Sequence, residues 1–205
     1  FWDQVKEQLS FAEQMAQQVK AVSQAAGAER ASKQYDLAAF IYHQPLMYYN
    51  HLWRGERQSF FWFGQIKFGD YDPALDRYVA RFNHLVQAAD AFSQIDLSAA
   101  DPQTGAKTLF SKALSYSKLI DYGVEVGFYD TKTHLGKQLI EACQALIARY
   151  PDSSLADDAM MLIYHYTHSA EWLEKLVKRY PNGDQAEAAE ALLRAIESDP
   201  KYNSM

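Results

Sequence analysis

The chain has 205 residues, of which 48% are hydrophobic, so it is long and apolar enough to bury a sizeable core in a single domain spanning residues 1–205. Its formal net charge of −6 is spread over interleaved acidic and basic residues, which does not form the clustered basic face of a nucleic-acid binder. No apolar run approaches the roughly 18–20 residues that cross a bilayer, so we expect no transmembrane segment. The sequence begins at Phe1 without a signal-peptide pattern, and we expect a processed or trimmed chain whose targeting segment has been removed.

Two long helices are predicted in the first 53 residues. Apolar residues spaced by three and four predict a helix that runs to about residue 26, with Gly27 as its stop. A second helix is predicted over residues 29–53, where Pro45 should kink or split it near residues 43–44. The stripe of the first helix is Trp2, Val5, Leu9, Ala12, Ala16 and Val19, and the second carries Leu37, Ile41, Tyr48 and Leu52 beside Ala38, Tyr42, Leu46, Tyr49 and Trp53.

The middle of the chain continues the helical period. Asp72 and Pro73 have the pattern of an N-cap and first helical residue, and the helix they begin is predicted to extend through Phe92. Residues 98–105 are predicted to form a loop, and residues 123–130 are left open between a connection and a short strand. Helices are predicted over residues 106–122, with Phe110, Ala113, Leu114 and Ser117 inward, and over residues 131–150, with Leu135, Leu139, Cys143 and Leu146 inward.

The last third of the chain contains an internal repeat. The six residues from Leu146 to Pro151 match those from Leu176 to Pro181, which gives a period of 30 residues. Self-similarity at this period predicts stacked helical hairpins, in which small alanines allow close helix approach. The match continues through Ala156 and Ala186, Ala159 and Ala189, and Leu162 and Leu192.

The stretch from Tyr150 to Ala159 resembles the tetratricopeptide repeats of bacterial cell-envelope proteins, such as the outer-membrane assembly lipoproteins and the Tol-Pal coordinator family. The resemblance is clearest over residues 144–194, although the repeat is shorter than the usual length of about 34 residues. It implies an all-α fold of about eight helices, stacked as antiparallel hairpins in a right-handed solenoid. It also implies a periplasmic or otherwise extracytoplasmic protein that binds other proteins or peptides.

Few residues have the spacing of a catalytic or metal site. His165, His168 and Glu171 are spaced by three and could ligate a metal from one helix face, but solvent-facing histidines near a helix end are the preferred interpretation. Cys143 is expected to be a buried thiol, and Asp157 and Asp158 to favour a helix N-terminus. No zincin, nucleophile-elbow or phosphate-loop motif is present, so we expect a non-enzymatic protein without metal or cofactor.

The aromatic residues between positions 40 and 71 are the main candidate for a binding surface. Four consecutive aromatics, 60–63, sweep about 300° around a helix, so at least one is expected at the surface, where it contacts a protein, a peptide or a second copy of this chain. The alternatives are a carbohydrate or peptidoglycan binder that stacks sugars on the tyrosines and tryptophans, and a metal-dependent enzyme that uses the His165 and His168 pair. The predicted binding residues are Tyr48, Tyr49, Trp53, Arg54, Arg57, Phe60, Phe61, Trp62, Phe63 and Lys67.

Overall fold

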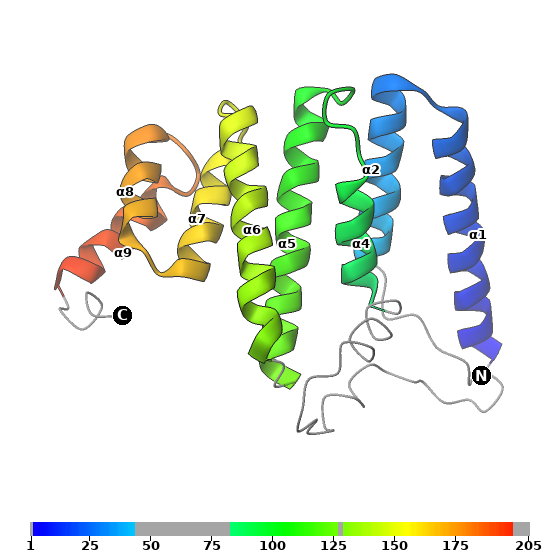
Figure 1. The fold of residues 1–205 in the computed structure, drawn as a ribbon, viewed down its shortest axis with the longest axis horizontal. Helices are drawn as coiled ribbons and strands as arrows, with labels where there is room; N and C mark the ends of the chain where they lie inside the picture. The colour runs from blue at the N-terminus through cyan, green and yellow to red at the C-terminus, as the bar shows by residue number, and fades with distance from the viewer. Residues whose placement is uncertain (1, 44–82, 127–128, 199–205) are drawn as a thin grey trace.

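A computed structural model describes residues 2–43, 83–126 and 129–198 of the chain. These residues form eight α-helices and no strand, which confirms the all-α prediction for the described ranges. The helices stand side by side in one row, with α1 at one end and α9 at the other (Figure 1). The short strand considered for residues 123–130 does not form in the described part, because α5 continues through Val126 and α6 begins at Tyr129.

The first two helices are α1 (Trp2–Gln24) and α2 (Gly27–His43). Gly27 has φ of +54°, a left-handed conformation that glycine adopts at little cost and that reverses the chain between the two helices. α2 accounts for most of the helix predicted over residues 29–53, and the remaining residues 44–53, with the break predicted at Pro45, lie outside the described residues. The two helices pack through Phe11 and Phe40, whose rings stack at 5.1 Å between centroids.

The apolar stripe predicted on α1 does not face α2. Leu9 is 57% exposed and Val19 is 49% exposed, and the alanines between them are exposed as well. A second stripe that includes Phe11 and Met15 faces α2 instead, because the aromatic ring buries more surface than the smaller residues of the predicted stripe. Spacing alone did not distinguish these two stripes.

Of the helix predicted from Pro73 to Phe92, residues 73–82 lie outside the described residues, and the later part corresponds to α4 (His84–Ser93). Asn83 is extended, and its side-chain oxygen accepts a hydrogen bond from Leu85 N at 2.9 Å. Asn83 is therefore the N-cap at which α4 begins, and the spacing of apolar residues did not predict a helix start at this position.

The loop predicted over residues 98–105 ends earlier than expected, because α5 (Pro102–Val126) begins inside it. Asp101 is the reason: its carboxylate accepts hydrogen bonds from Thr104 N at 2.9 Å and from Thr104 Oγ1 at 2.6 Å. Pro102 then occupies the first helical position, where the missing N–H costs nothing. Of the residues predicted to face inward on α5, Ala113 is buried, while Phe110, Leu114 and Ser117 are half-buried. The buried apolar residues of α5 are Ala106, Leu109, Ala113, Tyr116, Leu119 and Ile120.

Four further helices complete the row: α6 (Tyr129–Arg149), α7 (Ala156–Thr167), α8 (Ala170–Arg179) and α9 (Ala186–Ser198). On α6 the predicted inward residues Leu139, Cys143 and Leu146 are buried, while Leu135 is half-buried. The main core lies along α4 to α9, and a second cluster holds α2 against α4.

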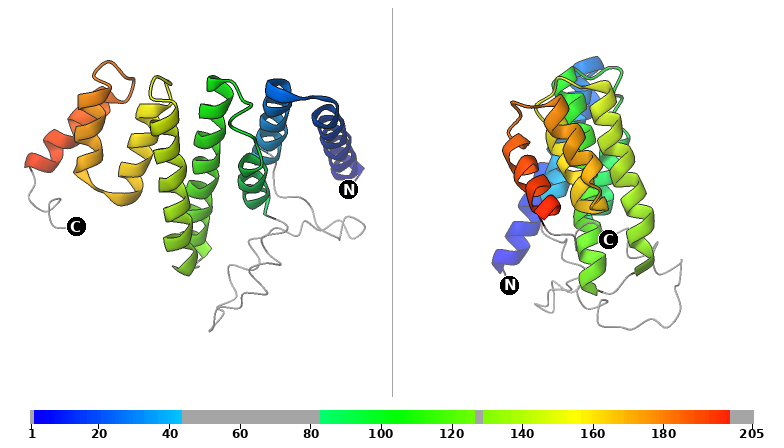
Figure 2. Two further views of the ribbon diagram at one scale, coloured as in Figure 1. Left: turned by 45° about the horizontal axis from the view of Figure 1, so that its top comes forward. Right: turned by 90° about the vertical axis from the view of Figure 1, so that its left-hand side faces the viewer.

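Neighbouring helices in the row run in opposite directions. From α2 onward, α2, α5, α7 and α9 run one way, and α4, α6 and α8 run the other way (Figures 1 and 2). Each helix packs on the next along the chain, and the most extensive of these contacts joins α5 to α6. α2 also touches α5 directly past α4, and these two helices run in the same direction.

The 30-residue repeat of the sequence is present in the structure. In the α6–α7 turn, Ser153 N donates to Tyr150 O at 3.0 Å, and in the α8–α9 turn Gly183 N donates to Tyr180 O at 2.9 Å. The four alanines expected at close helix contacts are all buried. The two turns therefore have the same backbone design. The other repeated N–H to carbonyl pairs are Tyr150 to Leu146 and Tyr180 to Leu176 (both 2.8 Å), Ala156 to Ser153 and Ala186 to Gly183 (3.0 and 3.2 Å), and Ala159 to Leu155 and Ala189 to Gln185 (3.0 and 2.9 Å).

Candidate functional site

The aromatic binding surface predicted from the sequence lies outside the described residues. Its position between α2 and α4 in the chain is the only structural information about it, and the prediction that one of its aromatics is exposed stays a prediction. The residues concerned are Tyr48, Tyr49, Trp53, Arg54, Arg57, Phe60, Phe61, Trp62, Phe63 and Lys67.

The three residues considered as metal ligands do not share one helix. α7 ends at Thr167, and His168 adopts a left-handed conformation with φ of 55° as the helix C-cap. Glu171 then belongs to the next helix, where its carboxylate pairs with Lys175 Nζ at 2.6 Å. The spacing of three therefore does not place His165, His168 and Glu171 on one helix face, and their ligand atoms do not gather. Both histidines are exposed, as the preferred interpretation expected.

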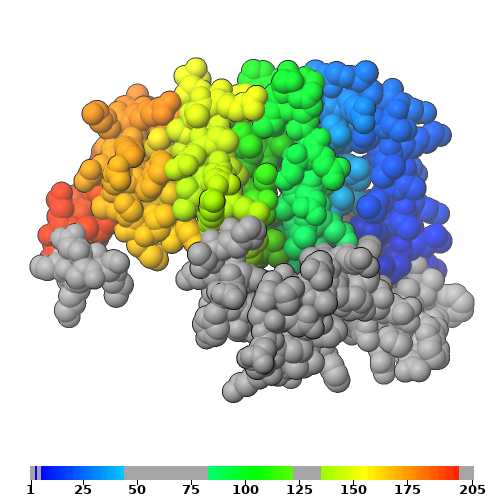
Figure 3. All heavy atoms as spheres, in the orientation of Figure 1, coloured from blue at the N-terminus to red at the C-terminus, as the bar shows by residue number. Residues whose placement is uncertain are grey.

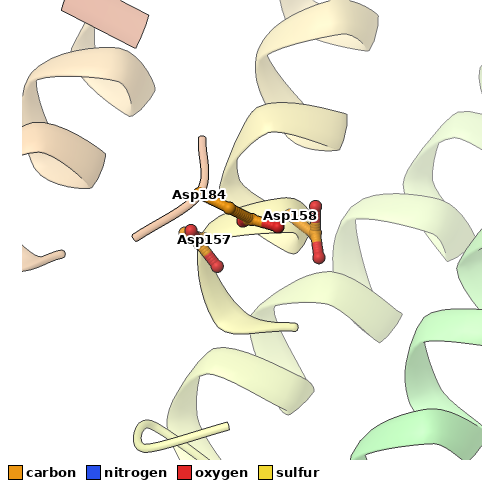
Figure 4. Close-up of side chains that lie close together, drawn as sticks. All are labelled: Asp157, Asp158 and Asp184. Carbon is orange, nitrogen blue, oxygen red and sulfur yellow. The ribbon is translucent and has the colours of Figure 1, made fainter. Parts of the chain in front are cut away.

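Among the described residues, three carboxylates do come together: Asp157, Asp158 and Asp184, with oxygens within 4.8 Å of one another. The first two lie in the first turn of α7 and the third in the α8–α9 turn (Figure 4). Asp157 is only 3% exposed, and its Oδ2 accepts a hydrogen bond from Gln185 N at 3.3 Å. Asp158 Oδ1 accepts from Gln185 Nε2 at 2.8 Å.

These contacts explain the aspartates as structural groups. They attach the α8–α9 turn to the start of α7, and the fit is tight, because a side chain at Gly183 would collide with the Asp157 carboxylate. Burial, followed by the charges of Asp184 and Asp157, raises the pKa of Asp158 above its usual value. The cluster thus joins one repeat to the next, although the close carboxylates repel one another.

Cys143 is completely buried in α6, as expected from its place on the inward stripe. Burial raises the pKa of its thiol to about 12. A thiol that is neither accessible nor ionised at neutral pH cannot serve as a nucleophile.

A groove crosses three elements of the row and is the candidate functional site. Its lining comes from Tyr35 of α2, from the first turns of α5 and from the α6–α7 turn. The start of α5 and this turn lie next to each other at the upper edge of the molecule in Figure 3. The groove has a volume of about 230 Å³ and is open to solvent. It is lined by Tyr35, Gln103, Lys107, Phe110, Ser111, Ser153, Ser154 and Leu155.

The groove combines apolar walls with hydroxyl groups and one positive charge. The rings of Tyr35 and Phe110 and the side chain of Leu155 are half-buried, so part of each remains accessible. Tyr35 Oη lies 3.4 Å from Ser111 Oγ, which ties α2 to α5 at the groove wall. Lys107 is exposed and is the single charged residue of the lining.

No sequence pattern predicted this groove. Its residues come from positions 35, 103–111 and 153–155, and no motif connects them. Phe110, which was expected to face inward, is half-buried: it packs against the main core and also lines the groove.

None of the described helices is both long and apolar enough to span a membrane, in agreement with the expectation from hydropathy. No protein-family model matches the chain, and no curated protein and no solved structure was found to match it.

Proposed function

We propose that this chain is a non-enzymatic interaction module of tetratricopeptide type, which binds a segment of another protein in the groove between α2, α5 and the α6–α7 turn. The observation that carries the proposal is the groove itself, because it crosses helices of the same direction. In stacked helical hairpins, such helices form a continuous surface on which extended partners are bound.

The stacking part of the proposal is supported by the repeated turn. Helix direction alternates along the row, and the same backbone hydrogen bonds recur after 30 residues. The two tyrosines of the repeat also act alike. Tyr150 packs on Gly105 near the start of α5, while Tyr180 Oη donates to Pro151 O at 2.9 Å just before α7. Each tyrosine follows one helix and reaches back to the beginning of the antiparallel helix before it, α5 for Tyr150 and α7 for Tyr180. A right-handed solenoid is the proposed continuation of this pattern.

The size of the groove favours a peptide over a small molecule or a cofactor. Pockets for small ligands usually measure about 300–1,000 Å³ and enclose most of the ligand. A groove of about 230 Å³ that is open to solvent accommodates one or two side chains of a longer segment instead.

No described residue favours the carbohydrate alternative, whose tyrosines and tryptophans lie outside the described ranges. The resemblance to cell-envelope repeats supports an extracytoplasmic setting as part of the same proposal.

The proposal is tested by blocking the groove without disturbing the core. Ser154 is an exposed turn residue of the groove wall, and Ser154→Trp should fill the groove. Asn182→Trp is the matched control, because Asn182 is exposed in the equivalent turn 30 residues after Asp152 and does not line the groove. Peptides selected from a random dodecapeptide phage library on the wild-type chain should bind Asn182→Trp normally and lose tenfold or more in affinity for Ser154→Trp.

Two results contradict the proposal. One is a set of selected peptides that bind Ser154→Trp as tightly as the wild type. The other is a selection that enriches no peptide on the wild type above the level found on Ser154→Trp. Unchanged melting temperatures of both variants establish that the comparison concerns binding and not folding.

A further inference from the structure

We infer that the groove selects an internal segment of its partner in which an acidic side chain lies next to a large apolar one. This inference rests on the proposed function and adds the chemistry of the bound segment. Three features of the groove support it: the positive charge of Lys107, which has no ion-pair partner among the described residues; the absence of carboxylates from the lining; and the accessible apolar side chains.

Lys107 is a positive charge that the described residues leave unpaired. Its neighbours at three and four positions along α5 are Gln103, Thr104, Phe110 and Ser111, none of which is acidic. Some lysines of the described helices are paired, whereas Lys6, Lys20 and Lys178, like Lys107, form no ion pair there. Lys33, Lys137 and Lys175 pair with glutamates four residues away, and Lys118 lies 4.4 Å from the centre of the Tyr42 ring.

The lining contains no carboxylate that would repel an acidic segment. Asp101 precedes the first groove residue of α5, and both of its oxygens already accept hydrogen bonds from Thr104. The hydroxyls of Ser111, Ser153 and Ser154 are the other polar groups along the groove. In a chain with a net charge of −6, this is a local site of positive charge with hydroxyl donors beside it.

The apolar walls define the second part of the ligand. Tyr35, Phe110 and Leu155 each present a half-buried surface to the groove. Covering this surface with an aliphatic or aromatic side chain removes apolar area from water and places the preceding or following residue near the rim. A carboxylate at that neighbouring residue is within the range of the flexible Lys107 side chain.

An internal acidic residue fits better than a free C-terminus. Terminal carboxylates are typically bound by a nest of backbone N–H groups. In the α6–α7 turn the amides of Ser153 and Leu155 are already engaged, the first by Tyr150 O at 3.0 Å and the second by Ser153 Oγ at 3.2 Å. The positive group available to a carboxylate of the ligand is therefore the ammonium group of Lys107.

The experiment measures the preference for Glu over Gln in synthetic peptides with an acetylated N-terminus and an amidated C-terminus. The peptides carry the apolar sequence enriched on the wild-type chain, followed by either Glu or Gln, and binding is followed by fluorescence anisotropy. We expect the Glu peptide to bind the wild type at least tenfold more tightly. Lys107→Gln should reduce this preference below twofold, and Lys107→Glu should invert it in favour of a Lys peptide. Lys112→Gln is the matched control, because Lys112 is on the same helix, does not line the groove and should retain the tenfold preference.

Each outcome is assigned in advance. If the Glu and Gln peptides bind the wild type with equal affinity and Ser154→Trp weakens both, the inference about charge is overturned and the proposed function stands. A preference that survives Lys107→Gln, or that Lys112→Gln removes equally, also overturns it. A Gln peptide with a free C-terminal carboxylate is also measured. If it binds as tightly as the amidated Glu peptide, the groove recognises a terminal carboxylate, and the choice of an internal segment is overturned. The absence of any peptide that Ser154→Trp blocks overturns both proposals.

Discussion

Two aspartates at helix starts have opposite electrostatic roles. At Asp101, hydrogen bonds from the Thr104 hydroxyl and the Thr104 amide lower the pKa of the carboxyl below its usual value. At Asp158, burial and the charges of Asp184 and Asp157 raise the pKa. The ionised form is thus favoured by folding at Asp101 and disfavoured at Asp158, although both residues lie near the positive end of a helix.

Asp158→Asn and Asp101→Asn should therefore change stability in opposite directions. The raised pKa of Asp158 means that its contribution is most favourable below the unfolded-state pKa and declines as pH rises through the folded-state pKa. We expect Asp158→Asn to raise the free energy of unfolding near pH 7, by less than about 1 kcal/mol because the site is partly exposed, and the gain should disappear near pH 4.

Asp101→Asn is the control with the opposite sign. The lowered pKa of Asp101 gives stability that is present above the unfolded-state pKa and is lost as pH falls through the folded-state pKa. This variant should be less stable than the wild type at pH 7, and the two should converge at low pH. Urea unfolding at several pH values measures both. A pH-independent difference for Asp158→Asn would contradict the assigned repulsion.

At the scale of single elements, the helices of the last two repeats are placed by alanines. Ala156 and Ala159 in α7, and Ala186 and Ala189 in α9, are buried where neighbouring helices approach closely. A close-packed interface has no space for additional methyl groups, so larger residues at these positions force the helices apart.

Ala159→Leu should lower the free energy of unfolding by about 1–3 kcal/mol, because it overpacks the interface. Ala148→Leu is the matched control, since Ala148 is exposed on α6 and leucine has nearly the same helix propensity as alanine. Chemical denaturation monitored by circular dichroism gives both values. Equal stability of Ala159→Leu and Ala148→Leu would show that the α7 contact tolerates expansion.

At the scale of the whole molecule, the row of helices is held together mainly by contacts between consecutive elements. α8 packs on α7 and α9, whereas α2 and α4 belong to the other end of the row. In such an arrangement, stability is approximately a sum of local terms and interfaces between neighbours, and a lesion at one end is not transmitted equally to the other.

Leu176→Ala tests this behaviour, because Leu176 is completely buried in α8. Amide hydrogen exchange should show a loss of protection in α7, α8 and α9, with little change in α2 and α4. Ala88, buried in α4, provides the reciprocal lesion: Ala88→Gly should lower protection in α2 and α4 first. Uniform loss of protection along the chain in either variant would indicate one cooperative unit and would contradict the proposed stacking.

Local periodicity determined the helical class and most of the inward residues of α6, because these follow from spacing along one element. Helix boundaries at Asn83 and Pro102 depended on side-chain caps. Asp101 and Pro102 have the same Asp-Pro pattern that predicted a helix start at Asp72 and Pro73, yet they were interpreted as part of a loop.

Tertiary structure decided which of two possible stripes is buried and which residues meet. On α1 the exposed stripe of Leu9 and Val19 and the packed stripe of Phe11 have similar periods, and only the position of α2 distinguishes them. The groove depends on the same kind of information. Tyr35, Lys107 and Leu155 are far apart in the chain and are brought together by helix stacking, which no local pattern encodes.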